Sequence, residues 1–272
     1  MKQTILFPLL FSSILLFGCG KPRENGQHIT ITGSSTVAPI VADAARRYEE
    51  SHPGVRIDVQ TGGSSRGIAD AMSGLADLGM ISRALKDGES ELTAHLIAMD
   101  GVCVIVHRDN RIENLTRKQL VDIYTGKISD WSEIGGAPGE IIVAGKAEGR
   151  ATLEVFLDYT GLDSADIEAD VLVGENQHAI KTVAGNANGI AYVSIGAAES
   201  ESEGGTPIRL IRCDGVIPTT EAVAKGLFPM TRPLQVVTRG DLPDASKAFL
   251  SYLQTAAIND LIETHFYVPV AR

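Results

Sequence analysis

The sequence predicts an α/β fold with mainly parallel sheets, arranged as two lobes that crossing strands join. Strand patterns alternate with helical periodicity from residue 28 onward, as they do in α/β domains. The 272 residues are enough for one large core or two modest ones. No Gly/Ser-rich linker divides the chain, so lobes that share strands fit better than two consecutive domains.

Each strand is predicted from alternating apolar residues or from a short apolar run, which is typical of strands with one or both faces buried. In chain order, the predicted strands are 29–32, 55–59, 78–81, 102–106, 141–144, 190–195, 207–213 and 234–238. Cys103 and Cys213 fall within two of these strands. We expect them to be separate buried thiols, because cysteine packs well as a small apolar residue.

The helices are predicted from apolar residues at helical spacing and from their end signals. They are expected over 39–50, 68–75 and 153–159, with another ending at Val183 and a long one over 245–264. Thr116 and Gln119 form a capping box, which predicts a helix that Gly126 closes. The Gly, Glu and Ser residues over 199–205 are expected to form a surface loop.

Composition excludes some classes of function. The net charge of −10 disfavours nucleic-acid binding, because such proteins usually present a basic face. An acidic protein can still bind an anion, since the local field of a cleft decides binding. No Cys/His spacing suggests a metal site, and no cofactor is expected.

The N-terminus predicts export and lipid anchoring. Lys2 precedes an apolar stretch over 5–17, which has the length of a signal-peptide core and is short for a membrane span. The stretch ends in Gly18 and Cys19, similar to the lipobox of bacterial lipoproteins, in which the Cys carries lipid. Residues 1–19 are therefore expected to be a lipoprotein signal peptide and residues 20–27 a tether. The alternative is an ordinary signal peptide with an incidental cysteine.

Three turns share a design that suits an anion. Each one, at 33–39, 62–67 and 146–152, is rich in small or hydroxyl residues and joins a predicted strand to a predicted helix. The first N–H groups of a helix are unpaired and carry partial positive charge, so an anion is their natural partner. Ser82 and Arg83 form a fourth candidate at a strand end, where Arg83 offers a bidentate fork to an oxyanion.

From Ile29 to Val270 the sequence resembles the phosphate-binding proteins of bacterial ABC transporters. Segments 33–40, 62–67 and 76–83 look like three of the family's phosphate-binding elements. Segments 115–131 and 189–194 are similar to two of its other recurrent stretches. The resemblance implies a two-lobed periplasmic-binding-protein fold of type II, with two crossover strands and a ligand cleft between the lobes. It places lobe I at 28–105 plus 235–272 and lobe II at 106–234.

The resemblance also implies the site and the partners. Phosphate would bind between the lobes, and ABC permease and ATPase subunits would receive it from a monomer anchored on the periplasmic side or outer face of the cell envelope. Hydrogen phosphate carries a proton that needs an acceptor, and Asp77 is the nearest acid in the sequence. The implied phosphate-binding residues are Ser34, Ser35, Thr36, Ser64, Ser82, Arg83, Lys146, Arg150 and Thr152.

The third turn departs from the family's usual pattern, in which an Arg is followed after two residues by Gly-Ser-Gly-Thr. Lys146 stands at the Arg position, Arg150 at the Ser and Ala151 at the second Gly. A lysine cannot form the bidentate fork, so Arg150 is expected to supply that charge. This departure leaves open another oxyanion, such as sulfate, or a phosphate sensor without a transporter.

A serine hydrolase is the rival of a different class. Residues 63–67 match the Gly-x-Ser-x-Gly elbow, with Ser65 in the nucleophile position and His178 or His265 available downstream. The elbow follows only the second predicted strand, and no His-Gly-Gly oxyanion motif precedes it. We therefore expect a binding protein and not an enzyme.

Overall fold

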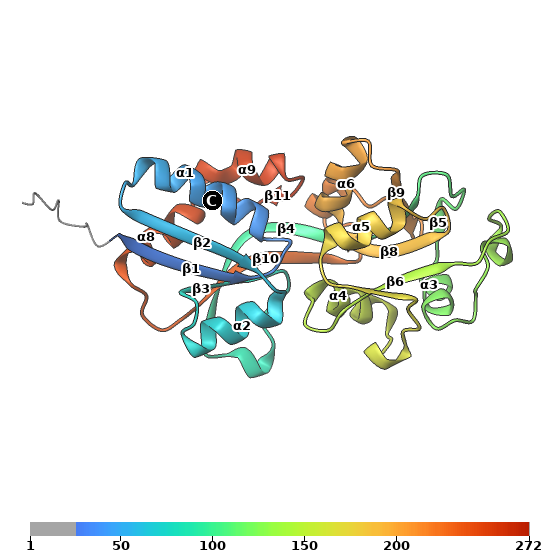
Figure 1. Ribbon diagram of the computed structural model, residues 1–272, viewed down its shortest axis with the longest axis horizontal. Coiled ribbons are helices and arrows are strands. Elements are labelled where there is room, and N and C mark those ends of the chain that lie inside the picture. Colours follow the sequence, from blue (N-terminus) through green and yellow to red (C-terminus); the bar gives the residue numbers. More distant parts are fainter. Residues whose placement is uncertain (1–25, 272) are drawn as a thin grey trace, which may run out of the picture.

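The computed structural model describes residues 26–271, and the predicted signal peptide with Cys19 lies outside them. Two groups of strands and helices lie side by side along the long axis of the molecule, and β4 (Leu92–His107) and β10 (Thr231–Arg239) run between them (Figure 1). The α/β class is confirmed, and so is the organisation as two lobes joined by shared strands. Among the described residues, no helix combines the length and apolar character that crossing a bilayer would require.

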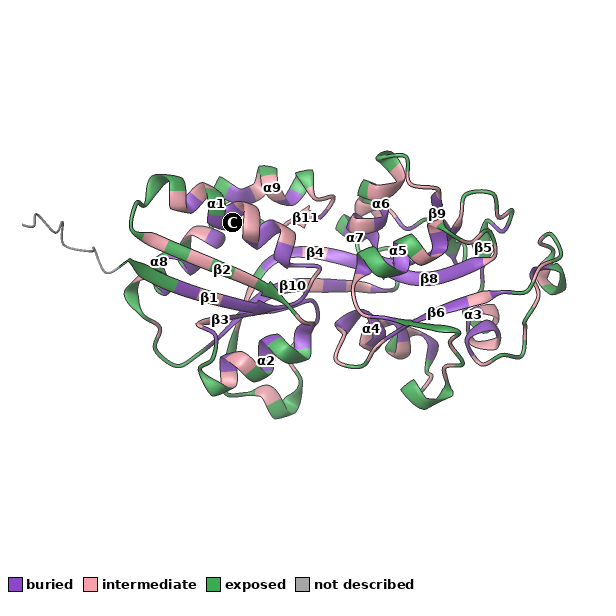
Figure 2. Ribbon diagram, in the orientation of Figure 1, coloured by how far each residue is buried: buried purple, intermediate pink, exposed green. Residues whose placement is uncertain are grey.

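Lobe I is built on three parallel strands, β1 (Gln27–Gly33), β2 (Val55–Thr61) and β3 (Leu78–Ile81), in the order β2-β1-β3. Strands β10 and β4 extend this sheet in the antiparallel sense. Helices cover both faces, because the apolar residues of the strands are buried on both sides (Figures 1 and 2). The helices of this lobe are α1 (Ala38–Ser51), α2 (Ser64–Ser73), α8 (Asp244–Leu253) and α9 (Asn259–Thr264).

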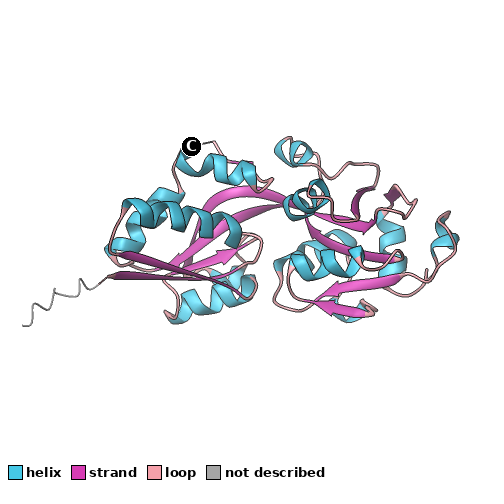
Figure 3. Ribbon diagram, turned by 45° about the horizontal axis from the view of Figure 1, so that its top comes forward, coloured by secondary structure: helices cyan, strands magenta, loops and turns pink. Residues whose placement is uncertain are grey.

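Lobe II has its own core around β8 (Gly189–Ser194), which is buried along its whole length. Helices lie on both sides of its strands (Figure 3). The other strands of this lobe are β5 (Asn114–Leu115), β6 (Ile142–Lys146), β7 (Val171–Val173) and β9 (Ile208–Cys213). Its helices are α3 (Arg117–Tyr124), α4 (Ala151–Thr160), α5 (Asn176–Ala184), α6 (Ile195–Glu203) and α7 (Thr220–Ala224).

Strand β4 passes from lobe I into lobe II and changes its pairing partners midway. Its first part, through Gly101, pairs with β10, whereas from Val102 onward it pairs with β8 and then β9. The side chains from Val102 to Val106 belong to the core of lobe II. The predicted boundary after residue 105 therefore lies inside lobe II, and the predicted boundary at 234/235 falls within β10, whose ladder belongs to lobe I.

Two predicted elements are wrong, and local capping explains both. Residues 199–205 were expected to be a loop, yet Ser194 caps a helix, α6, that extends to Glu203. The long helix over 245–264 is divided into α8, a 3₁₀ turn at Ala256–Ile258 and α9. It breaks where Thr255 Oγ1 accepts a hydrogen bond from the N–H of Ala257, which gives the backbone an alternative to the helical bond.

Other local predictions are confirmed. Thr116 and Gln119 form the capping box that begins α3. Gly161 ends α4 in the left-handed conformation that favours glycine. Cys103 and Cys213 are both buried and unpaired with each other.

Helix α2 approaches β3 so closely that side chains are excluded from the contact. A Cβ on Gly79 would lie 2.3 Å from the carbonyl oxygen of Gly67, and a Cβ on Gly67 would lie 2.6 Å from that of Met80. Backbone atoms cannot move aside as a side chain can. The two glycines therefore set how near α2 lies to the strand ends.

We expect Gly79→Ala to lower the free energy of unfolding by about 1–3 kcal/mol or more, because the methyl group would force the helix away from the strand. Urea denaturation measures the change. Gly88→Ala is the matched control, since a Cβ at Gly88 meets nothing within 4 Å. Equal midpoints for the two variants would contradict the close-approach argument.

Candidate anion-binding site

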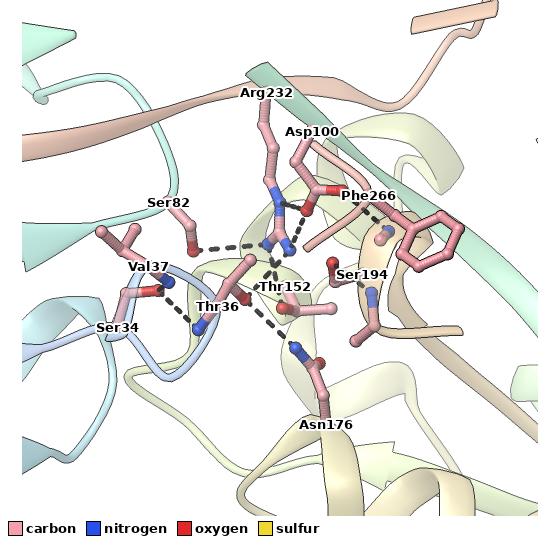
Figure 4. Close-up of polar contacts among 12 residues, drawn as sticks. Ser34, Thr36, Val37, Ser82, Asp100, Thr152, Asn176, Ser194, Arg232 and Phe266 are labelled. Carbon is pink, nitrogen blue, oxygen red and sulfur yellow. Dashed lines mark hydrogen bonds and ion pairs between the residues drawn. The ribbon is translucent and has the colours of Figure 1, made fainter. Parts of the chain in front are cut away.

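Hydroxyl side chains from both lobes gather where the lobes meet (Figure 4). All are buried, and each follows the carboxyl end of a strand, the edge at which α/β sheets bind ligands. We call these residues the hydroxyl cluster: Ser34, Thr36, Ser64, Ser82 and Thr152. The sequence predicted all five. Ser34, Thr36, Ser64 and Ser82 come from lobe I and Thr152 from lobe II.

The turn before α1 places Thr36 in the centre of this cluster. Ser34 Oγ accepts hydrogen bonds from the N–H groups of Thr36 and Val37, at 3.2 and 3.4 Å, and so holds the turn in shape. Thr36 Oγ1 lies 3.2 Å from Asn176 Nδ2 of lobe II and 3.2 Å from Nη2 of Arg232. Ser34 is therefore a structural hydroxyl, whereas Thr36 contacts polar groups of both lobes.

The start of α2 is held against the next strand end and against lobe II. Ser64 Oγ accepts a hydrogen bond of 3.1 Å from the N–H of Ser82. The N–H of Ser65 donates to the carbonyl of Gly149 across the two lobes, at 3.2 Å. Gly63 has φ +94°, and a Cβ there would lie 2.7 Å from the Gly149 oxygen, so only glycine fits this contact.

Arg232, at the beginning of β10, is the central side chain of the site and was not predicted. Its side chain is 1% exposed. Its Nη1 lies 3.0 Å from Thr152 Oγ1 and 3.4 Å from Ser82 Oγ. One guanidinium therefore contacts three hydroxyls of the cluster, including that of Thr36. The single signal in the sequence was an arginine two positions before the predicted strand 234–238.

Asp100 of β4 neutralises Arg232 from the side away from the cluster (Figure 4). Its Oδ2 accepts from Nε and Nη2 of Arg232 at 3.0 and 2.8 Å, and both side chains are 1% exposed. Asp100 Oδ1 lies 3.4 Å from the N–H of Gly196. The carboxylate thus fixes the plane of the guanidinium and turns its remaining donors toward the hydroxyls.

Lys146, at the end of β6, supplies a second cation. Its Nζ lies 3.0 Å from the carbonyl oxygen of Glu175 and 3.5 Å from Asn176 Oδ1. Burial lowers the pKa of Lys146 to about 7. The charges of Arg232 and Arg150 act in the same direction, and the charge of Glu175 opposes them. The amine is therefore close to half protonated near neutral pH.

Arg150 lies at the edge of the site and is paired with an acid. Its Nη1 lies 2.7 Å from Glu175 Oε1, and its Cδ lies 2.9 Å from the position that a Cβ on Gly63 would occupy. Burial opposes ionisation of Glu175, but hydrogen bonds from Ser35 and Arg150 hold the pKa of Glu175 below its ordinary value. The structure thus brings Arg150 and Ser35 to the same carboxylate, one from each lobe.

Arg83 lies apart from the hydroxyl cluster, and its fork is occupied. Its two Nη atoms bind the carboxylate of Glu89 at 2.8 and 2.7 Å, and its Nε lies 2.9 Å from Glu154 on α4. Lys86 Nζ reaches the same Glu154 oxygen at 2.7 Å. We call these four residues the lobe-bridging ion cluster. The guanidinium of Arg83, which was expected to bind an oxyanion, binds the carboxylates of Glu89 and Glu154 instead. Their proximity to Arg83 could not be predicted from the sequence.

Asp77 and His265, the candidate proton acceptor and the candidate triad histidine, both have structural roles. Asp77 Oδ2 accepts from the N–H of Thr30 and so joins β1 to the segment before β3. His265 pairs with Asp43 at 2.8 Å. Among residues 26–271, no hydrogen bond joins a histidine to Ser64 or Ser65, so the geometry of a catalytic triad is not present there.

The arrangement presents hydrogen-bond donors and positive charge in a buried place. Among the described residues, the carboxylates beside it, Asp100 and Glu175, are each paired with an arginine. Helices α1, α2 and α4 begin at it, and the first turn of a helix carries partial positive charge. Such a site can hold a small dehydrated oxyanion, whose oxygens must all find donors. Fold and site thus define a two-lobed protein with a buried, donor-rich cluster between its lobes, which suits a small oxyanion.

Known proteins agree with this class. A family model described as a PBP superfamily domain matches residues 21–257, and the chain belongs to this superfamily. The phosphate-binding protein PstS of Bacillus subtilis (strain 168) is 28% identical over 256 residues, which cover 92% of this chain and 83% of that protein.

Two solved structures are similar over nearly the whole chain. A protein of Clostridium perfringens, described as a phosphate ABC transporter substrate-binding protein with bound phosphate, has 29% identity and a TM-score of 0.84, covering 90% of this chain and 100% of that one. An ABC-type phosphate transport receptor of Vibrio cholerae has 30% identity and a TM-score of 0.73, covering 89% and 100%.

Proposed function

We propose that this protein binds inorganic phosphate between its lobes and presents it to the permease and ATPase subunits of an ABC transporter. The observation that carries the proposal is the buried Arg232 guanidinium, which lies against hydroxyls from both lobes. The names of the relatives support phosphate as the anion and an ABC transporter as the partner.

In this proposal the site residues divide into two groups. Arg232, Thr36, Ser82 and Thr152 contact the anion through side chains, and Lys146 adds charge beside them. The positive ends of helices α1 and α2, which begin near Ser34, Ser35 and Ser64, add a favourable potential for the anion. Arg150 and Arg83 act indirectly, since each is held by a carboxylate. They favour the closed arrangement of the lobes that encloses the anion.

The protein acts by binding and not by catalysis in this proposal. The curated and solved relatives carry the names of binding and transport proteins. We further propose that Cys19 carries a lipid that anchors a monomer to the cell envelope. Its support is the lipobox-like segment before Cys19 and the polar stretch over 20–27.

Isothermal titration of residues 20–272, freed of ligand by unfolding and refolding, tests the proposal with phosphate and then sulfate. We expect tight one-to-one phosphate binding and no response to sulfate. Binding of sulfate alone would make another oxyanion the ligand. A folded sample that binds neither anion would contradict the proposal.

We expect Glu154→Gln to weaken phosphate binding about fivefold, which corresponds to roughly 1 kcal/mol of closed-state stabilisation. Glu154 is the lobe II member of the lobe-bridging ion cluster, and the change removes its charge while keeping its size. Stopped-flow release kinetics should show the loss as faster dissociation. Glu91→Gln is the control, because the exposed Glu91–Arg239 pair lies within lobe I. Equal release rates would argue against a bridging role.

A further inference from the structure

Lys146 differs from the other cations of the site in having no acid of its own. Arg232 is paired with Asp100, and Arg150 is paired with Glu175. Lys146 Nζ contacts only a backbone carbonyl and an amide oxygen. Among the residues that the structure describes, no carboxylate lies within ion-pair distance of it. Among the described residues its positive charge, when present, is therefore offset only by the more distant Glu175 carboxylate, which Arg150 already pairs.

Every charged group around Lys146 comes from a different element. Arg232 faces it from β10, Arg150 from the turn before α4 and Glu175 from the residue before α5. The Tyr192 hydroxyl of β8 accepts from the Lys146 backbone N–H at 3.0 Å. Two positive charges and burial, with the side chain 4% exposed, outweigh the one negative charge of Glu175. Above neutral pH these groups favour the neutral amine until an anion is bound.

A bound oxyanion reverses this balance. A divalent anion held by Arg232 and the hydroxyl cluster would place negative charge close to Nζ, and a nearby opposite charge favours the protonated form. We propose that anion capture at this site is coupled to protonation of Lys146, so that each divalent oxyanion bound above neutral pH brings one proton with it. The amine takes that proton from the solvent buffer, and the resulting ammonium donates a hydrogen bond to the anion.

This coupling rests on the proposed function for the identity of the anion. The coupling also predicts that a lysine at the third turn makes anion affinity depend on pH, whereas an arginine there would not. A guanidinium stays charged over the whole physiological range, so it would bind the anion with little dependence on pH. With lysine, affinity for the dianion should fall about tenfold for each pH unit above about 7.

Titration calorimetry near pH 8.5, in two buffers of different ionisation enthalpy, measures the protons taken up for each phosphate bound. At this pH inorganic phosphate is already almost wholly the dianion, so uptake reports on the protein. We expect about one proton for the unmodified protein and almost none for Lys146→Arg, which should also lose the steep fall in affinity. Lys127→Arg, at an exposed lysine, should behave like the unmodified protein.

The outcomes separate this inference from the proposed function. Tight phosphate binding without proton uptake would overturn the coupling and leave phosphate binding intact. Uptake that persists in Lys146→Arg would also overturn it, because another group would then be the acceptor. If Lys146→Arg does not fold, Lys146→Met provides the same comparison, with circular dichroism as the check. No phosphate binding at any pH would overturn both proposals.

Discussion

Replacement of Arg232 by alanine is expected to weaken phosphate binding by about two orders of magnitude or more. The side chain contacts Thr36, Ser82 and Thr152, and in the proposed complex its two Nη groups donate to the anion. A hydrogen bond to a charged group contributes roughly 1.5–3 kcal/mol, so the loss of two corresponds to at least about a hundredfold in the dissociation constant.

Two further variants, compared with Arg232→Ala, test whether the paired donors of the guanidinium are responsible. Arg232→Lys keeps the charge but not the planar pair of donors, so its affinity should lie between those of the alanine variant and the unmodified protein. Arg46→Ala is the matched control, because the Arg46 side chain is 72% exposed on α1. Titration calorimetry compares the three. Unchanged affinity in a folded Arg232→Ala protein would rule out the guanidinium as the main ligand.

The second large effect is expected at Asp100, and it concerns stability. Asp100→Ala should lower the free energy of unfolding by about 3–5 kcal/mol, because it leaves the Arg232 charge buried without a counter-ion. Asp100→Asn should cost less, since the amide oxygen still accepts a hydrogen bond. Urea denaturation without phosphate measures both, and Asp241→Ala, at a fully exposed aspartate, is the control.

A double variant tests whether the instability of Asp100→Ala comes from the unpaired charge of Arg232. Asp100→Ala combined with Arg232→Met removes both ions, and replacing both partners of a buried pair by apolar groups is often close to neutral. We therefore expect the double variant to be more stable than Asp100→Ala alone. If the two were equally destabilised, packing around Asp100 would explain the loss and the ion pair would not.

The sequence predicted those parts of the fold and the site that depend on neighbouring residues. The capping box at Thr116 and the glycine end at Gly161 are local, because their hydrogen bonds join residues a few positions apart. The three turns are local too: each is a short segment that directly follows a strand, and the parallel strands of each lobe end at the same edge. The turns mark where an anion would bind, and the resemblance to the phosphate-binding family named the five hydroxyls, of which Ser82 lies outside the three turns.

Two segments were predicted wrongly or missed because their local sequence patterns are weak or misleading. Residues 199–205 have the composition of a loop, but the cap at Ser194 and the buried Ala198 hold the segment in a helix as far as Glu203. The first part of β4 was missed because its alternation is imperfect, and it becomes a strand by pairing with β10. For 199–205 a local cap outweighs the loop composition, whereas for β4 the pairing with a distant strand outweighs the weak pattern of the segment.

The sequence by itself determined the α/β class, the three anion-directed turns and the hydroxyl residues that they carry. Only the tertiary structure decided which cations meet them. Arg232 and Asp100 lie far apart in the chain and become a pair because β10 and β4 are neighbours in one sheet. Arg83 became a link between lobes because folding brought Glu154 beside it. The direction of a long charged side chain depends on its partners in space, and residue type alone does not reveal them.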